Sequence, residues 1–187
     1  AETVPAFSPD SMDLDFPSGA SGSSFVALLL EMVEGGSLQD RIKLEALKED
    51  ELRYIARDIL EGLRHIHEQG YMHLDIKPAN IFLTETGRAK IGDFGSLCLH
   101  IDYRAHSTNE GDSTYLAPEL YGDTPFPVHA PDIFSLGVTL LECATMLEIP
   151  KSGVVDSEGY RALREDHCPK LFLEGLSPEL QAMVLKM

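Results

Sequence analysis

The spacing of apolar residues along the chain predicts three helices. Between residues 49 and 69, apolar side chains recur every three or four positions, which is the period of an amphipathic helix, and Gly70 is suited to end it. The stretch DIFSLGVTLLECATML, residues 132–147, is apolar nearly all round, which indicates a buried helix. Near the end of the chain, Ser177 and Pro178 have the pattern of an N-cap followed by a first helical residue.

Shorter apolar runs predict strands. We expect FVALLLEMV, residues 25–33, to be a buried strand that ends at EGGS, and Ser37 to cap a short helix with Asp40 three residues on. The segments NIFLT and AKIGDF flank the glycine-containing turn ETGR, so residues 80–94 are predicted to form an antiparallel hairpin. Residues 95–117 have no clear period and many small polar side chains, which favours a long surface loop.

Composition narrows the class of protein. The 187 residues include 31 acidic and 15 basic side chains, for a formal net charge of -16, which argues against nucleic acid or an anionic membrane as the main partner. The three cysteines have no C-x-x-C spacing, so we interpret them as reduced thiols of an intracellular protein. No window is apolar for long enough to predict a membrane segment in this piece.

The two ends of the sequence differ from its middle. Residues 1–24 are rich in Ser, Pro, Gly and Asp and are predicted to be a disordered or linker segment, which leaves residues 25–187 as the folded part. The chain begins with Ala1 and stops at Met187 within a helical pattern. We therefore expect it to be a piece of a longer chain, cut at both ends.

Four polar residues surround the predicted hairpin. Asn80 begins its first strand and Asp93 ends its second, so antiparallel pairing brings them together, while Asp75 and Lys77 lie in the loop that enters the same end. Two carboxylates and an amide oxygen suit Mg²⁺, and a lysine beside them suits a phosphoryl group. Each residue alone fits an ordinary turn or surface position, but the four together favour a catalytic site.

Three motifs in this region resemble those of the protein kinases. HLDIKPAN, residues 73–80, has the form of the catalytic loop H-R-D-x-K-x-x-N. It is followed by the metal-binding triplet Asp93-Phe94-Gly95 and by the triplet Ala117-Pro118-Glu119, which closes the activation segment. The motifs occur in the order that the family has, with plausible gaps between them.

The resemblance covers about residues 25–187. LLLEMVEGGSL, residues 28–38, is similar to the family's hinge, and DIFSLGVTLLE is similar to its buried central helix, with Phe134 where Trp is usual. The implied fold is a protein kinase-like α+β fold, with a mainly helical large lobe plus the hinge and with the small lobe largely absent. The implied cofactors are ATP and Mg²⁺.

The resemblance implies a role for ten residues. Asp75 would orient the substrate hydroxyl and Lys77 would steady the γ-phosphate, as the catalytic pair. Asn80 and Asp93 would hold Mg²⁺. Three would bind ATP: Glu31 and Val33 through backbone groups, and Phe82 as part of the pocket floor. The last three, His73, Glu119 and Asp132, would support the site, with Asp132 bracing the catalytic loop. A plain structural role is the alternative for Glu31, Val33, Phe82 and Asp132, and for Val33 and Phe82 a core role is compatible with the binding role.

Two details suggest a branch of the family. Lys77 is typical of the Ser/Thr type of catalytic loop. Leu74 replaces the Arg that usually pairs with a phosphate on the activation loop, so we expect this loop to be ordered without phosphorylation at that site. Together with EGDSTYLAPEL and ATMLEIP, these residues resemble the Wee family and its membrane-associated Myt branch. That resemblance implies inhibitory phosphorylation of a cyclin-dependent kinase, bound to its cyclin, in the nucleus or cytoplasm.

Some parts of a kinase are missing from the sequence. It has no glycine-rich loop, no strand lysine for the phosphates and no helix glutamate to pair with that lysine. The family's arginine partner of Glu119 would lie beyond Met187, which would leave a buried, unpaired carboxylate. We therefore expect this piece alone to be poorly stable and inactive. A pseudokinase or docking module is the alternative function, whereas the second and third motifs argue against a small-molecule phosphotransferase.

Overall fold

The computed structural model describes residues 29–103, 112–123, 125–146, 162–165, 168, 170 and 173–187. The chain divides into two compact units, Ala1–Met32 and Val33–Met187, and the features that follow belong to the second. Within the described part of the first, Leu29, Leu30 and Met32 are exposed and form no strand. The predicted buried strand is therefore wrong from residue 29 onward, because no described strand pairs with it; residues 1–28 lie outside the description.

Helix α2, Glu49–Glu68, confirms the amphipathic pattern. Its apolar face is buried, and the members of that face are Leu52, Ile55, Ala56, Ile59 and Leu63. The helix starts where the Glu51 carboxylate accepts a hydrogen bond from the Lys48 backbone N–H, at 3.1 Å. It ends before Gly70, whose positive φ of 79° is a conformation that glycine adopts without strain.

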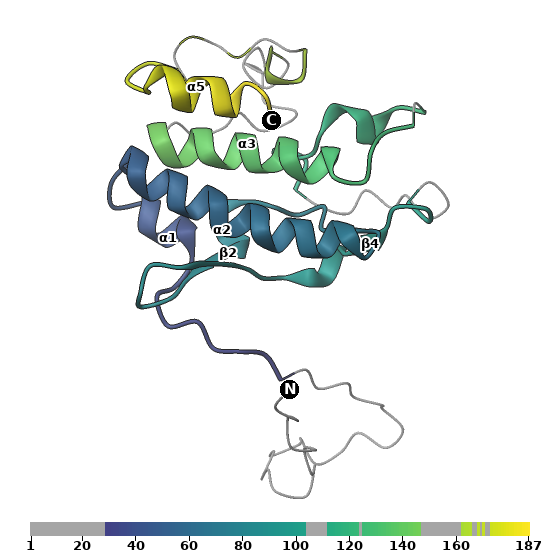
Figure 1. Ribbon diagram of the computed structural model, residues 1–187, viewed down its shortest axis with the longest axis horizontal. Coiled ribbons are helices and arrows are strands. Elements are labelled where there is room, and N and C mark those ends of the chain that lie inside the picture. The colour runs from purple at the N-terminus through teal and green to yellow at the C-terminus, as the bar shows by residue number, and fades with distance from the viewer. Residues whose placement is uncertain are drawn as a thin grey trace, which may run out of the picture. The chain divides into compact units, whose positions relative to one another are not determined.

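Helix α3, Ala130–Thr145, is the buried helix that the sequence predicts, and it begins two residues earlier than expected, with Pro131 in its first turn. It contacts α2 on one side and α5, Pro178–Val184, on another (Figure 1). The predicted cap of α5 is also confirmed, because the Ser177 hydroxyl accepts a hydrogen bond from the Leu180 N–H at 3.2 Å. Leu180 and Val184 bury the inner face of this helix. The three helices form the apolar core that supports the strands.

The strands form two small antiparallel sheets. In the first, β2, Ile81–Leu83, pairs with β3, Ala89–Ile91, as the predicted hairpin. Strand β2 contacts α1, Leu38–Ile42, and strand β3 contacts α2. In the second, β1, Tyr71–Met72, pairs with β4, Cys98–Leu99. The described part is thus mainly helical with short strands, which agrees with the expected α+β class.

The stretch predicted as a surface loop, residues 95–117, is only partly one. It contains β4 and the end of the 3₁₀ helix η3, Phe94–Ser96, and its residues 114–117 are buried. Neither feature has a local signal, because β4 is two residues long and its residues pair with partners 26 and 28 positions away. Two further 3₁₀ helices, η2, Pro78–Asn80, and η4, Pro118–Tyr121, flank the segments that build the site.

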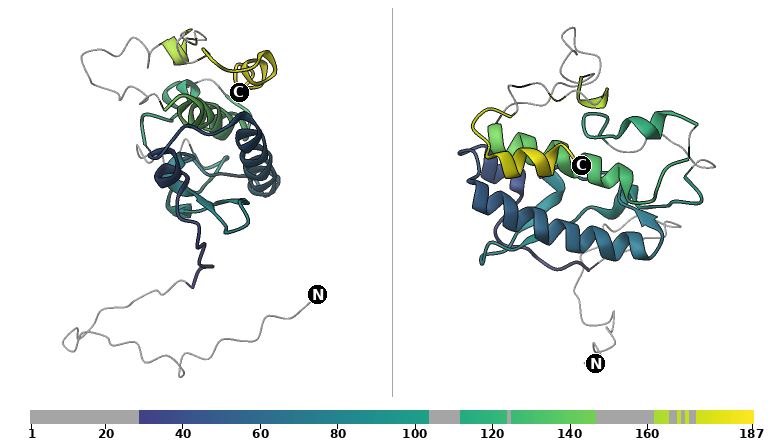
Figure 2. Two further views of the ribbon diagram at one scale, coloured as in Figure 1. Left: turned by 90° about the vertical axis from the view of Figure 1, so that its left-hand side faces the viewer. Right: turned by 45° about the horizontal axis from the view of Figure 1, so that its top comes forward.

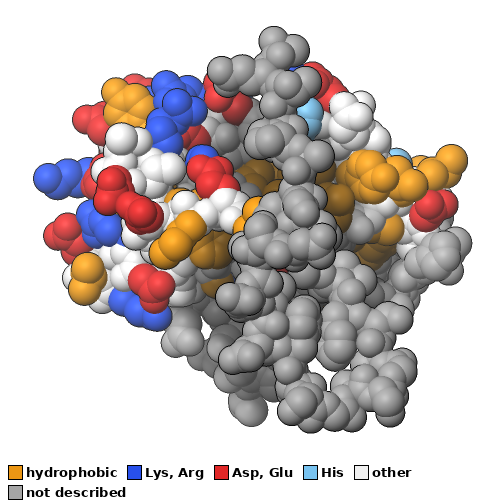
Figure 3. All heavy atoms as spheres, turned by 90° about the horizontal axis from the view of Figure 1, so that it is seen from below, with side chains coloured by type: hydrophobic (Ala, Val, Ile, Leu, Met, Phe, Trp, Pro, Cys, Tyr) orange, Lys and Arg blue, Asp and Glu red, His pale blue; other side chains and the backbone are white. Residues whose placement is uncertain are grey.

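The surface around α1 carries charges of both signs. Figure 3 shows acidic and basic side chains interspersed on the left, the side on which Figure 1 places α1. Exposed pairs there include Lys43 with Asp40 at 2.9 Å and Arg41 with Glu45 at 3.2 Å.

Among the residues described, no helix is both long and apolar enough to cross a bilayer.

Candidate active site

The catalytic-loop motif lies between β1 and β2. His73, Leu74 and Ile76 are buried, whereas Asp75 and Lys77 are half-buried and reach the surface of the site. The backbone of Leu74 has a positive φ of 63°, which is unusual for a side chain with a Cβ. A strained residue of this kind persists only where the surrounding structure holds it in place.

Asp132 holds this strained turn. Its carboxylate, at the start of α3, accepts hydrogen bonds from the backbone N–H groups of His73 at 2.9 Å and Leu74 at 2.8 Å. The same carboxylate is 2.7 Å from Nε2 of His67 on α2, and it is fully buried. The three contacts join two helices and the catalytic loop at one point. Sequence reasoning missed His67, because its partner lies 65 residues away and its own spacing gives no sign of that contact.

Asp75 is oriented from three directions. Its Oδ2 and its backbone oxygen accept hydrogen bonds from the Asn80 amide at 2.6 and 2.9 Å. Its Oδ1 lies 2.9 Å from Nζ of Lys77 and accepts a hydrogen bond from the Asp112 backbone N–H at 3.2 Å. The structure thus brings together three of the four residues expected to converge, and it adds Asp112, which the sequence prediction did not include among the site residues.

Asp93 reaches the same end of the hairpin through the register of its strands. Ile81 pairs with Ile91, and the next pair outward is closed by a hydrogen bond from the Gly92 N–H to the Asn80 carbonyl, at 2.9 Å. Asp93 follows with a positive φ of 57°, is exposed, and accepts a hydrogen bond from the Gly95 N–H at 3.2 Å. The hairpin therefore places Asp93 one residue beyond Gly92, the residue that pairs with Asn80.

The oxygens of Asn80 and Asp93 fit a hard cation. The Asn80 amide nitrogen faces Asp75, so its amide oxygen is the atom left for another ligand. Within the described ranges, no group of three or more His, Cys, Asp or Glu side chains has the arrangement of a metal site. A site with one carboxylate and one amide suits Mg²⁺, which keeps waters and phosphate oxygens as most of its ligands.

His73 connects the catalytic loop to the Asp93-Phe94-Gly95 segment. Its Nδ1 accepts a hydrogen bond from the Asp75 N–H at 3.3 Å, so Nε2 carries the proton and donates to the Gly92 carbonyl at 3.2 Å. The ring also packs edge-on against Phe94, with 5.4 Å between centroids. Burial lowers the pKa of His73, although the charge of Asp132 acts in the opposite direction. A neutral imidazole suits both hydrogen bonds.

The remaining predicted residues lie in less distinctive positions. Val33 and Phe82 are half-buried, and Phe82 packs so closely on Gly92 that a Cβ there would lie 2.6 Å from its ring. Glu31 is exposed and belongs to the first compact unit, so the site is built without it. Glu119 is half-buried, which corrects the expectation of a buried carboxylate, because η4 has no buried residue.

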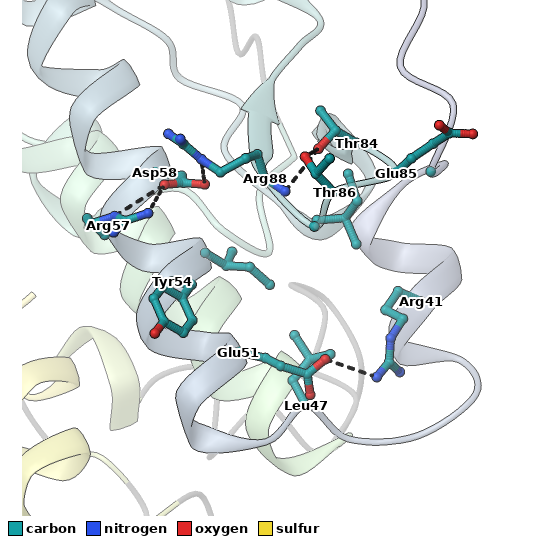
Figure 4. Close-up of a pocket in the computed structure, with 14 residues that line it drawn as sticks. Arg41, Leu47, Glu51, Tyr54, Arg57, Asp58, Thr84, Glu85, Thr86 and Arg88 are labelled. Carbon is teal, nitrogen blue, oxygen red and sulfur yellow. Dashed lines mark hydrogen bonds and ion pairs between the residues drawn. The ribbon is translucent and has the colours of Figure 1, made fainter.

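A separate pocket of about 640 Å³ lies between α1, α2 and the turn that joins β2 to β3 (Figure 4). Leu47 and Ile55 form part of its apolar lining, and Arg41 pairs with Glu51 across one side at 3.4 Å. None of the ten predicted site residues lines this pocket. The candidate active site is therefore the catalytic loop with the end of the hairpin, and not this hollow.

Comparison with known proteins agrees with the architecture and the motifs. Residues 17–180 match the protein kinase domain family, so the chain belongs to that family. Members of the family use ATP and a divalent metal, and the predicted kinase-like fold is confirmed.

Individual relatives narrow the similarity. The chain is 41% identical over 153 residues to the membrane-associated tyrosine- and threonine-specific cdc2-inhibitory kinase wee-1.3 of Caenorhabditis briggsae, covering 81% of this chain and 22% of that protein. It is 42% identical over 137 residues to the mitosis inhibitor protein kinase SWE1 of Candida albicans, covering 70% and 11%. The expected resemblance to the Wee family is confirmed. The chain spans about a fifth or less of the length of these two relatives.

Proposed function

We propose that this chain is the large lobe of a protein kinase that transfers the γ-phosphoryl group of ATP to a protein hydroxyl. The observation that carries the proposal is the position of Asp75, which Lys77, Asn80 and Asp112 hold at the surface of the site. A carboxylate fixed in this way can orient an acceptor hydroxyl and take its proton as the new P–O bond forms and the bond between the γ-phosphorus and the departing ADP oxygen breaks. Turn residues without a catalytic role have no need of such convergence.

The neighbouring residues divide the remaining work. Lys77 would neutralise charge on the transferred phosphoryl group, and Asn80 and Asp93 would hold Mg²⁺ through their side-chain oxygens. When bound, the metal supplies charge neutralisation at the phosphate oxygens. A backbone group of Val33 and the ring of Phe82 are proposed to contact ATP. His73 and Asp132 fix the loop, so that Asp75 has one orientation instead of several.

The proposed acceptor is a Tyr or Thr of a cyclin-dependent kinase bound to its cyclin. The names of the relatives, cdc2-inhibitory kinase and mitosis inhibitor protein kinase, support an inhibitory role in cell-cycle control. Lys77 belongs to the Ser/Thr type of loop, whereas the first relative is named as tyrosine- and threonine-specific, so we propose a dual acceptor. We propose action in the nucleus or cytoplasm, on the same resemblance.

The test is phosphoryl transfer by the full-length protein, because this chain contains no glycine-rich loop or strand lysine. The acceptor is a catalytically dead cyclin-dependent kinase with its cyclin, and mass spectrometry locates the phosphate. Asp75→Asn should reduce the rate by about 10²–10⁴-fold, the range for loss of a positioned base. Asp50→Asn, an exposed aspartate in the first turn of α2, is the matched control and should leave the rate unchanged. Folded protein that transfers no phosphate from Mg-ATP would instead support a pseudokinase.

A further inference from the structure

One arginine from the C-terminal part of the chain holds the stretch before the Ala117-Pro118-Glu119 motif. We call residues 112–117 the closing segment. Nη2 of Arg164 lies within hydrogen-bond distance of three of its carbonyl oxygens: Ser113 at 3.0 Å, Thr114 at 2.9 Å and Leu116 at 2.8 Å. The two N–H groups of Nη2 are shared among these three acceptors. Figure 2 shows residues 162–165 in yellow-green, and the hydrogen bonds of Arg164 attach this part of the chain to the closing segment. The contacts join parts of the chain 48 to 51 residues apart.

The position suits the planar shape of a guanidinium. Arg164 is half-buried, and its Cζ lies 5.5 Å from the ring centroid of Phe134 on α3. A guanidinium can stack on an aromatic face while its edge donates hydrogen bonds, whereas a lysine ammonium cannot do both in the same way. The three carbonyls lie outside helices and strands, so they need partners of this kind.

Other contacts tie the closing segment to the active site. The Asp112 N–H donates to Asp75 at 3.2 Å, and the Ser135 hydroxyl of α3 donates to the Tyr115 carbonyl at 2.8 Å. The Tyr115 hydroxyl donates to the carboxylate of Glu142, also on α3. Arg164 thus completes a set of attachments to a segment whose first residue touches the proposed catalytic base.

We propose that Arg164 is a positioning residue, which fixes the closing segment as the platform for the protein acceptor without phosphorylation of the activation loop. This inference rests on the proposed phosphoryl transfer. Position 74 of the catalytic loop carries the buried, uncharged Leu74. The positive charge that holds the closing segment is therefore that of Arg164, which follows α3. Loss of Arg164 loosens the surface that receives the acceptor more than it disturbs the binding of ATP.

The experiment compares Michaelis constants in the full-length protein. Arg164→Ala should raise KM for the cyclin-dependent kinase acceptor about tenfold, which corresponds to the loss of charged hydrogen bonds, and should change KM for ATP less than about twofold. Arg164→Lys should restore part of the loss. Arg64→Ala removes an exposed arginine of α2 that pairs with Glu68, one helical turn away, and it should change neither constant. Phosphatase treatment of the wild type should leave both constants unchanged.

Three kinetic results would overturn the inference. They are an unchanged acceptor KM in Arg164→Ala, an equal rise of both constants, and a phosphatase-treated wild type whose acceptor KM rises. If Arg164→Ala does not fold, Phe134→Leu removes only the stacking partner and should raise the acceptor KM by a smaller factor. Hydrogen exchange at the Tyr115 amide, which donates to the Asp112 carbonyl, separates this inference from the proposed function. If the wild type transfers no phosphate, the proposed function fails. If hydrogen exchange at the Tyr115 amide is no faster in Arg164→Lys than in the wild type, the positioning role of Arg164 is overturned.

Discussion

Two buried aspartates attach strands and loops to helices in this protein, and they use different kinds of partner. Asp132 on α3 accepts hydrogen bonds from two backbone N–H groups of the catalytic loop and contacts His67. Asp58 on α2 accepts hydrogen bonds from Arg88 at 2.7 Å and Arg57 at 3.0 Å (Figure 4). It also accepts one from the Ala89 N–H of β3 at 3.1 Å.

The difference separates function from stability. The side chains of Arg57 and Arg88 are 54% and 58% exposed, so water solvates the charges that neutralise the buried carboxylate of Asp58. The main partners of Asp132 are backbone amides, and the geometry that it fixes is that of the catalytic loop itself. Loss of Asp132 should therefore damage activity and stability together, whereas loss of Asp58 should damage stability alone.

The largest expected effect is that of Asp132→Ala. It leaves the buried N–H groups of His73 and Leu74 without an acceptor and releases the strained turn, at a cost of about 3 kcal/mol or more. The free energy of unfolding in urea measures this loss, and phosphoryl transfer by the full-length protein should become undetectable. Asp132→Asn, which keeps one acceptor oxygen, should be intermediate. An alanine variant with wild-type stability and activity would show that the turn holds itself.

Asp58→Asn should have the next largest effect. The uncharged amide loses the ionic part of two hydrogen bonds while both arginines remain in water, so we expect a cost of about 1–3 kcal/mol. The kcat and KM values of the folded fraction should match the wild type. A lower kcat at full folding would contradict the separation between the two aspartates.

Acid provides a second measurement on the same variant. Burial acts to raise the pKa of Asp58, but hydrogen bonds from Arg88, Ala89 and Arg57 hold that pKa below its ordinary value. The stability that this provides is present above the unfolded pKa of about 3.9 and is lost as pH falls through the folded value. Asp58→Asn should therefore lose less stability than the wild type between pH 5 and pH 2, values chosen to bracket that range.

The contrast also shows what the sequence can predict. Local periodicity identifies α2 and α3, and the N-cap pattern identifies α5, because those signals lie within a few residues of each other. The hairpin could be predicted as well, and with it the proximity of Asn80 and Asp93, because a short turn determines which residues pair.

Contacts between distant segments had no such signal. Asp58 lies within an amphipathic helix, and its partner Ala89 is 31 residues away. Asp112 and Arg164 contact residues 37 to 51 positions distant, and no spacing in the sequence marks them. From residue 29 onward, the strand expected at 25–33 is absent for a related reason: an apolar run becomes a strand only where another strand pairs with it.

His73 should make a smaller, pH-dependent contribution. Because the folded pKa of His73 is lowered by burial, the unfolded chain binds its proton more readily, so stability falls as pH drops below the ordinary histidine value of about 6.5. One such proton sets a slope of at most about 1.4 kcal/mol per pH unit. His73→Phe keeps an aromatic ring beside Phe94 and should reduce the difference in Tm between pH 7.5 and 5.5, values chosen around that pKa. An equal difference in both proteins would assign the pH dependence to other groups.

The smallest expected effect concerns Glu61, a second acid near Arg88. Its carboxylate lies 3.9 Å from Arg88 Nη2 and is 62% exposed, whereas the Asp58 side chain is 2% exposed. An exposed ion pair is screened by water and contributes little, so Glu61→Gln should change the free energy of unfolding by no more than about 0.5 kcal/mol. The paired measurement with Asp58→Asn keeps Arg88 and compares an exposed acid with a buried one that also accepts hydrogen bonds from Arg57 and Ala89. A loss in Glu61→Gln as large as that in Asp58→Asn would mean that charge near Arg88, and not burial of the carboxylate, stabilises the attachment of β3 to α2.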